Sequence, residues 1–115
     1  MTRTPQEVFA HHGRALGAED LDEIVADFAD DAVVITPAGV NRGEDGVRAA
    51  FTRLLADRPG AAWDVKTQMY QDNVLLLEWA AGTAESRADD GVDTFVFRDG
   101  LIQAETVHYT LRRRS

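Results

Sequence analysis

The spacing of apolar residues changes from the helical to the strand period near the middle of this 115-residue chain, and that change constrains the fold more than any other feature. Before about residue 60, apolar side chains recur every three or four positions, whereas after it they tend to alternate with polar ones. Helices that precede an antiparallel meander cover one face of its sheet. The sequence therefore predicts one α+β domain spanning residues 1–115.

Three helices are expected in the first half of the chain. A proline in the first turn and a glycine after the last turn delimit the first helix. Asp20, followed three positions later by Glu23, resembles a capping box and starts the second helix, whose apolar positions continue to Phe28. The expected elements are helices at residues 5–16, from residue 20 onward and at 44–56, with a strand at 32–36.

The second half has the pattern of an antiparallel meander. Asp99-Gly100 is the strongest hairpin signal in the chain, because this dipeptide suits the two left-handed positions of a type I′ turn. Strands are expected at residues 63–71, 74–83, 92–98 and 101–111, with a polar loop at 85–91.

Charge and composition exclude several functions. The net charge is −8, whereas nucleic acids and anionic membranes are polyanions that require a basic surface. Cysteine is absent, which excludes disulfides, thiol nucleophiles and zinc ribbons. No apolar run reaches the ~18 residues of a membrane span, and residues 1–16 contain no stretch of signal-peptide type. We therefore expect a cytoplasmic protein with no nucleic-acid or membrane partner.

Two groups of residues could suggest a metal site. Seven acidic residues lie between Glu19 and Asp31, and the histidines are at positions 11, 12 and 108. The acidic residues alternate with apolar positions and form the wet side of the second expected helix. No spacing of the histidines relative to carboxylates supports a ligand set. We expect neither a metal nor a cofactor.

Asp93 is the first candidate for chemistry. A period of two in residues 92–98 places it on the same face as Phe95 and Phe97. If that face lies under the helices, desolvation among aromatic rings raises the pKa of the carboxyl group. The alternative is that Asp93 begins its strand and meets solvent or Arg87.

His12 is the second candidate, because the apolar stripe of the first helix is centred on it and His11 falls at the edge. An enclosed histidine near Asp93 would give two titratable groups in one space, as acid and base assignments require. The alternative is a core histidine bonded to a backbone carbonyl. On the last strand, His108 and Tyr109 point to opposite faces, and only one of them can face inward.

Two segments resemble a known superfamily. The helix-to-strand segment AEDLDEIVADFADDAVVITPAGVNRG and the hairpin VDTFVFRDGLIQAETVHY are similar to nuclear transport factor 2-like proteins, in particular the ketosteroid isomerase and SnoaL-like polyketide cyclase branch. The resemblance implies a cone-shaped α+β barrel in which three N-terminal helices pack on a strongly curved mixed sheet around one apolar pocket. It also implies dimerisation through the outer face of the sheet.

Carried over by position, the resemblance assigns several residues to the pocket. Thr36 occupies the place of the ketosteroid isomerase general base, a role that threonine cannot fill. The oxyanion-hole aspartate corresponds to Asp93 and the oxyanion-hole tyrosine to His12, so these two are the expected catalytic residues. The expected substrate-binding residues are Thr36, Phe51, Phe95, Phe97 and Tyr109.

Three functions remain open from the sequence. The first is an acid/base enzyme of the cyclase, isomerase or dehydratase kind, acting on an apolar carbonyl-bearing substrate: Asp93 would exchange a proton and His12 would polarise the carbonyl. The second is a non-catalytic protein that binds a small apolar molecule, and the third is a dimerisation module. Apolar residues on both faces of the strand that starts at Val74 predict a homodimer, since the helices cover only one face.

Overall fold

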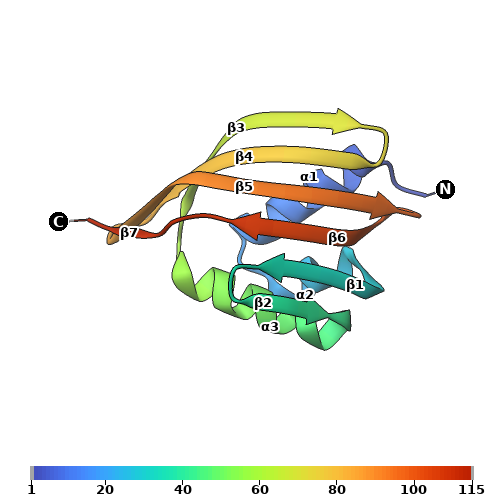
Figure 1. The fold of residues 1–115 in the computed structure, drawn as a ribbon, viewed down its shortest axis with the longest axis horizontal. Helices are drawn as coiled ribbons and strands as arrows, with labels where there is room; N and C mark the ends of the chain where they lie inside the picture. The colour runs from blue at the N-terminus through green and yellow to red at the C-terminus, as the bar shows by residue number, and fades with distance from the viewer. Residues whose placement is uncertain (1, 115) are drawn as a thin grey trace.

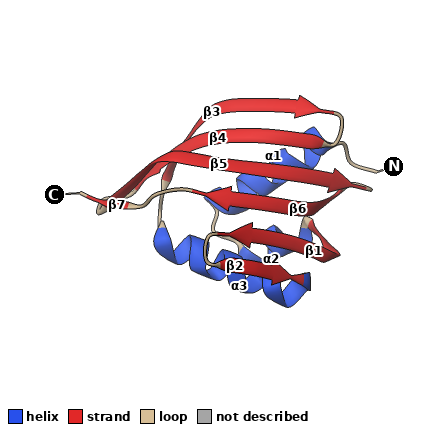
Figure 2. Cartoon of the chain, in the orientation of Figure 1, coloured by secondary structure: helices blue, strands red, loops and turns tan. Residues whose placement is uncertain are grey.

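Three helices pack on one face of a curved, open sheet in the computed structural model, which describes residues 2–114 (Figure 1). Figure 2 shows the helices gathered on one side of the strands. The elements are α1 (Pro5–Gly17), α2 (Leu21–Ala26), β1 (Phe28–Thr36), β2 (Gly39–Arg42), α3 (Gly43–Asp57), β3 (Ala62–Gln71), β4 (Val74–Gly82), β5 (Ser86–Arg98), β6 (Leu101–His108) and β7 (Arg112–Arg113). The α+β class and its three helices are as the sequence predicts.

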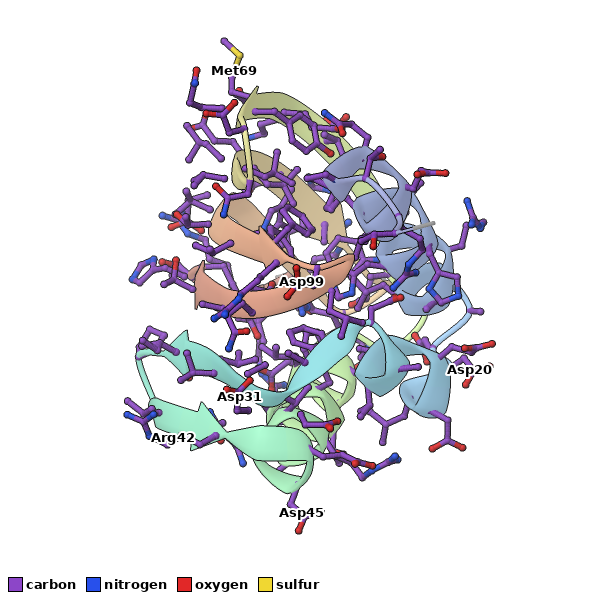
Figure 3. All side chains as sticks on the ribbon, turned by 90° about the vertical axis from the view of Figure 1, so that its right-hand side faces the viewer. Asp20, Asp31, Arg42, Asp45, Met69 and Asp99 are labelled. Carbon is purple, nitrogen blue, oxygen red and sulfur yellow. The ribbon has the colours of Figure 1, made fainter. Side chains whose placement is uncertain are left out.

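The sheet has the strand order β2-β1-β6-β5-β4-β3, and β7 pairs with β5 beside this path. The pair β1–β6 is parallel, while the other paired strands run antiparallel. Register shifts interrupt four of the pairings, and such bulges bend and twist a sheet. In the side view of Figure 3, the strands lie on one side and the helices on the other. The sheet curves without closing into a barrel.

Local sequence signals set the N-terminal ends of the first two helices. The Thr4 side chain accepts a hydrogen bond from the Glu7 backbone N–H at 3.1 Å, and the Glu7 carboxylate accepts one from the Thr4 backbone at 2.8 Å. Asp20 caps α2 through the backbone N–H of Glu23, at 3.2 Å. α1 places Val8, His12 and Ala15 against the sheet.

The second helix is shorter than its apolar period predicts. α2 ends at Ala26, and Phe28 is the first residue of β1, paired with Ile102 of β6. The backbone N–H of Ile102 donates to the Asp27 carbonyl at 2.8 Å, which holds the chain in the sheet. Pairing with a distant strand therefore overrides the helical pattern. The hairpin strand β2, with Gly39 at φ 146°, was not expected either.

Two strand ends also differ from expectation. Residues 86–91 of the segment expected to be a polar loop, 85–91, form the first part of β5, because they pair with β4 and β7. The last strand ends at His108, and β7 follows as a separate short pairing. Asp99 and Gly100 do occupy the left-handed turn positions, at φ 52° and 78°. In the described residues 2–114, no helix is long and apolar enough to cross a bilayer.

A one-residue bulge decides which side chains of β6 face the helices. Phe97 pairs with Ile102, but Val96 pairs with Ala104, so Gln103 is the extra residue. Beyond it the alternation is inverted. Glu105 consequently lies opposite Phe95 on the inner face.

Gly91 leaves room for the indole of Trp79, its partner across β4 and β5. A Cβ atom at Gly91 would lie 2.2 Å from Cδ2 of Trp79, far closer than van der Waals contact allows. Trp79 is buried, at 3% exposed. This glycine is therefore required by packing rather than by backbone angle.

We predict that Gly91→Ala lowers the free energy of unfolding by about 2–3 kcal/mol, because the indole must shift in a packed core. Urea titration followed by tryptophan fluorescence measures the change. Gly13→Ala is the control, since nothing lies within 4 Å of the added carbon and alanine favours a helix. Equal stability of Gly91→Ala and the wild type would contradict this account of Trp79.

Candidate active site

An apolar cavity of about 220 Å³ lies between the helices and the inner face of the sheet. Side chains from α1, α3 and strands β3 to β6 form its walls. They include Phe9, His12 and Leu16 from α1, Phe51, Leu54 and Arg58 from α3 and its C-cap, and Trp63, Val65, Leu77, Trp79, Asp93, Phe95, Glu105 and Val107 from the sheet. Four titratable side chains thus meet in one apolar enclosure.

Asp93 lies on the inner face, as the alternation predicts, and is 7% exposed. Nε1 of Trp79 donates a hydrogen bond to its Oδ1 at 3.0 Å. Burial raises the pKa of the Asp93 carboxyl, while hydrogen bonds from Glu105 and Trp79 and the charge of Arg58 oppose that rise. Arg87 bonds to Asp89 instead, at 2.7 Å, so the alternative contact of Asp93 with Arg87 is not formed.

Glu105 is the partner of Asp93 within the cavity. It is fully buried, and the two carboxyl groups share a side-chain hydrogen bond. Burial, the charge of Asp93 and this hydrogen bond all raise the pKa of Glu105 well above its usual range. Two buried carboxyl groups in hydrogen-bond contact do not readily both ionise, so the pair shares one proton and carries one negative charge.

Arg58, the C-cap residue of α3, is enclosed by aromatic rings. Its guanidinium carbon lies 4.8 Å from the ring centre of Trp63, 4.9 Å from that of Trp79 and 4.4 Å from that of Tyr109. Nε donates to the Leu54 carbonyl at 3.4 Å. Nη1 is buried and has no hydrogen-bond partner.

His12 is buried in an aromatic cluster at the other end of the cavity. Rings of Phe28, Phe51 and Phe95 surround it, with centroids 5.5–5.8 Å away and edge-to-face orientation. Neither ring nitrogen has a partner, so the expected alternative of a bond to a backbone carbonyl is absent. Burial lowers the pKa of His12 to about 4, which leaves a neutral imidazole at physiological pH.

His11 is more exposed to solvent than His12, as expected, and belongs to a different cluster of side chains. Its Nδ1 lies 2.6 Å from Oδ2 of Asp27, whose Oδ1 accepts a hydrogen bond from Arg3 at 2.9 Å. These contacts fasten α1 and the N-terminal segment to the start of β1. His11 plays a structural part and does not line the cavity.

The expected substrate-binding residues are divided among three places. Phe51 and Phe95 line the cavity, whereas Phe97 stacks behind Phe95 with ring centroids 6.0 Å apart. Thr36 lies in a neighbouring open hollow of about 420 Å³. Tyr109 borders that same hollow, packs on Arg58 and donates to Asp57 at 2.8 Å.

Two site residues, Glu105 and Arg58, were not predicted from the sequence. Without the bulge at Gln103, strict alternation from the Asp99-Gly100 turn would point Glu105 away from Asp93. Arg58 precedes Pro59 at the end of a helix, where a solvated arginine is ordinary. Among the described residues 2–114, no group of three or more His, Asp or Glu side chains could hold a metal ion.

A curved open sheet, three helices and an apolar cavity between them define a class of small α+β pocket proteins. The chain belongs to the SnoaL-like domain family, whose sequence profile matches residues 9–105. No match is found among curated proteins.

Solved structures share the fold. A nuclear transport factor 2-like protein from Burkholderia xenovorans is 24% identical, with TM-score 0.74 over 92% of this chain and 82% of that one. A candidate ketosteroid isomerase from Kribbella flavida is 16% identical, with TM-score 0.76 over 96% and 82%. IdmH, a candidate polyketide cyclase from Streptomyces antibioticus, is 17% identical, with TM-score 0.73 over 93% and 92%.

We predict that His12→Leu raises the free energy of unfolding at pH 7 by about 1–3 kcal/mol, because it removes two buried nitrogens without partners. His108→Leu, on the exposed outer face, is the control and should change stability by no more than about 0.5 kcal/mol.

The gain in the free energy of unfolding of His12→Leu should also depend on pH. The folded pKa of His12 is near 4 against 6.5 for the free group, so the unfolded chain binds the proton first as pH falls. The wild type therefore loses up to about 3 kcal/mol relative to His12→Leu between pH 6.5 and 4. Chemical denaturation at several pH values measures the difference, and a flat difference would contradict the buried neutral state.

Proposed function

We propose that this protein is an acid/base enzyme that acts on an apolar carbonyl compound, of the isomerase, cyclase or dehydratase kind. The observation that carries the proposal is a buried ionisable carboxylate, Asp93, in the same apolar cavity as a neutral and unpartnered His12. Asp93 would accept a proton from the carbon next to the carbonyl. His12 would donate a hydrogen bond to the carbonyl oxygen.

The surroundings of Asp93 favour a base over a structural carboxylate. A surface aspartate is a weak base, and burial raises the pKa of Asp93 toward the range where proton transfer is efficient. The Trp79 N–H fixes the direction of the carboxylate. No ion pair within 4 Å neutralises Asp93 among residues 2–114.

His12 suits a hydrogen-bond donor to a carbonyl oxygen. A neutral imidazole carries one N–H, and in this fold that N–H has no protein acceptor. An unpaired buried donor costs free energy, which a carbonyl oxygen in the cavity would recover. The similarity to a candidate ketosteroid isomerase and a candidate polyketide cyclase supports carbonyl chemistry. Thr36 supplies no base, which leaves that role to Asp93.

We predict that the wild type accelerates exchange of the α-protons of 2-methylcyclohexanone in D₂O, measured by proton NMR. Asp93→Asn should lower the enzyme-dependent rate by at least about a hundredfold, the usual contribution of a positioned base. Because the base must be ionised, the rate should fall as pH drops through the raised pKa of Asp93.

Asp64→Asn is the matched control, since Asp64 is exposed on β3. Saturable binding of the ketone without exchange would favour a non-catalytic binding protein. Exchange that persists in Asp93→Asn would remove Asp93 from the base role.

We also propose a homodimer formed through the outer face of the sheet. β4 alternates cleanly, with Leu75 and Leu77 buried and Val74 and Leu76 exposed. The strand register extends the exposed side into one row across six strands. This outer row consists of Val40, Ile35, Thr106, Thr94, Leu76 and Met69. Uncharged and largely apolar, it has the composition of a surface that a second copy covers.

We predict that the wild type sediments as a dimer at micromolar concentration and that Leu76→Glu sediments as a monomer, because the charge would be buried in the interface. Leu111→Glu is the matched control: Leu111 is 41% exposed and Leu76 is 42% exposed, but Leu111 lies outside the outer row. A wild type that is monomeric throughout that range would refute the dimer.

A further inference from the structure

We propose that Arg58 binds a second oxygen of the ligand, opposite the carbonyl oxygen that His12 bonds, and that the site takes carbonyl compounds of single-ring size in which this second oxygen shares the negative charge of the enolate. The proposal rests on the proposed function for the origin of the enolate, but the binding of an anionic oxygen can be measured without any reaction. Arg58 would be a catalytic residue, in contact with the substrate.

The first observation is a buried cation with a free donor. Nη1 of Arg58 has no partner, and the three aromatic rings around the guanidinium offer π faces rather than acceptor lone pairs. No carboxylate lies within 4 Å of the guanidinium among residues 2–114. A planar guanidinium held on ring faces in this way is rigid, and its remaining N–H groups suit an oxygen anion.

The second observation is the order of groups along β5. Trp79, against which Arg58 packs, lies over Gly91, while His12 packs on Phe95. Asp93 lies between these two points on the same inner face. Residues two apart on a strand are separated by roughly 6.6–6.8 Å. A ligand above Asp93 therefore has Arg58 toward one end and His12 toward the other.

The third observation is the balance of charge. Arg58 carries one positive charge, and the hydrogen-bonded Asp93 and Glu105 share one negative charge and one proton. When Asp93 takes the α-proton, the C–H electron pair forms the carbon–carbon double bond of the enolate and the carbonyl π electrons move onto oxygen. The negative charge then passes from Asp93 to the enolate, whose conjugated second oxygen shares it, and Arg58 remains the counter-charge. The net charge of the apolar cavity is constant throughout.

The size of the cavity limits the ligand. Its volume is about 220 Å³, and an engineered apolar cavity of about 150 Å³ in another protein holds benzene. One substituted ring fits this space. Apolar walls such as Leu77 and Phe95 suit the hydrocarbon part of that ring.

The test compares two ring compounds of matched shape by isothermal titration calorimetry. Ionised 1,3-cyclohexanedione is a stable enolate at neutral pH, and 3-methoxycyclohex-2-enone is its neutral methyl ether. We expect the wild type to bind the enolate about ten- to a hundredfold more tightly, the range of one charge-assisted hydrogen bond, and to take up one proton on Asp93 as it does so, which keeps the net charge of the cavity constant. This comparison uses the unmodified protein and needs no variant to fold.

Arg58→Met then assigns the preference to its residue, since methionine keeps the length of the side chain without its charge. We expect this variant to lose the preference for the enolate and to keep its affinity for the ether. Arg48→Met, which removes a partly exposed arginine of α3 that pairs with Asp22, should retain the wild-type preference.

Two results would overturn the proposal: equal affinity of the wild type for both compounds, or an unchanged preference in folded Arg58→Met. The failures of the two proposals are distinguishable. Ketone exchange that depends on Asp93, without preference for the enolate, would leave the acid/base function standing and reject Arg58. Preference for the enolate that depends on Arg58, without exchange, would leave a protein that binds anionic ring compounds.

Discussion

The position of the Trp79 indole connects the fold to the site. The ring lies over Gly91, where any side chain would displace it, and its Nε1 donates to Asp93. Its faces contact Arg58 and the ring of Trp63. A buried indole N–H requires an acceptor, so satisfying it also directs the carboxylate. One aromatic side chain therefore orients the negative group and holds the positive group of the cavity.

Local patterns in the sequence were sufficient for most helices and for two site residues. The capping of α1, the apolar stripe centred on His12 and the alternation around Asp93 depend on residues within one element, and the structure places both side chains in the cavity. Boundaries that depend on distant pairing could not be found in this way. Phe28 fits the helical period of α2, yet it begins β1 because β6 supplies hydrogen-bond partners there.

The inner face of β6 could not be predicted because one inserted residue inverts it. Gln103 shifts the pairing with β5, which turns Glu105 toward Asp93 and brings Tyr109 rather than His108 against Arg58. Nothing in the composition of that segment marks a bulge. The sequence around Arg58 does not mark it as a site residue either, because its burial depends on aromatic rings contributed by three other segments. The apolar lining of the cavity was therefore easier to predict than its charges.

The parallel pair β1–β6 has a consequence for how the chain is made. β1 comes from the first third of the protein, and its partner β6 is formed by residues 101–108. During synthesis the helices and the β1–β2 hairpin precede the strand that joins them to β5, so the inner face cannot close until residues 101–108 have left the ribosome. Contacts between such distant segments slow folding and expose strand edges in the meantime. A chain truncated before β6 would thus have two separate groups of strands, β1–β2 and β3–β5, rather than a smaller folded domain.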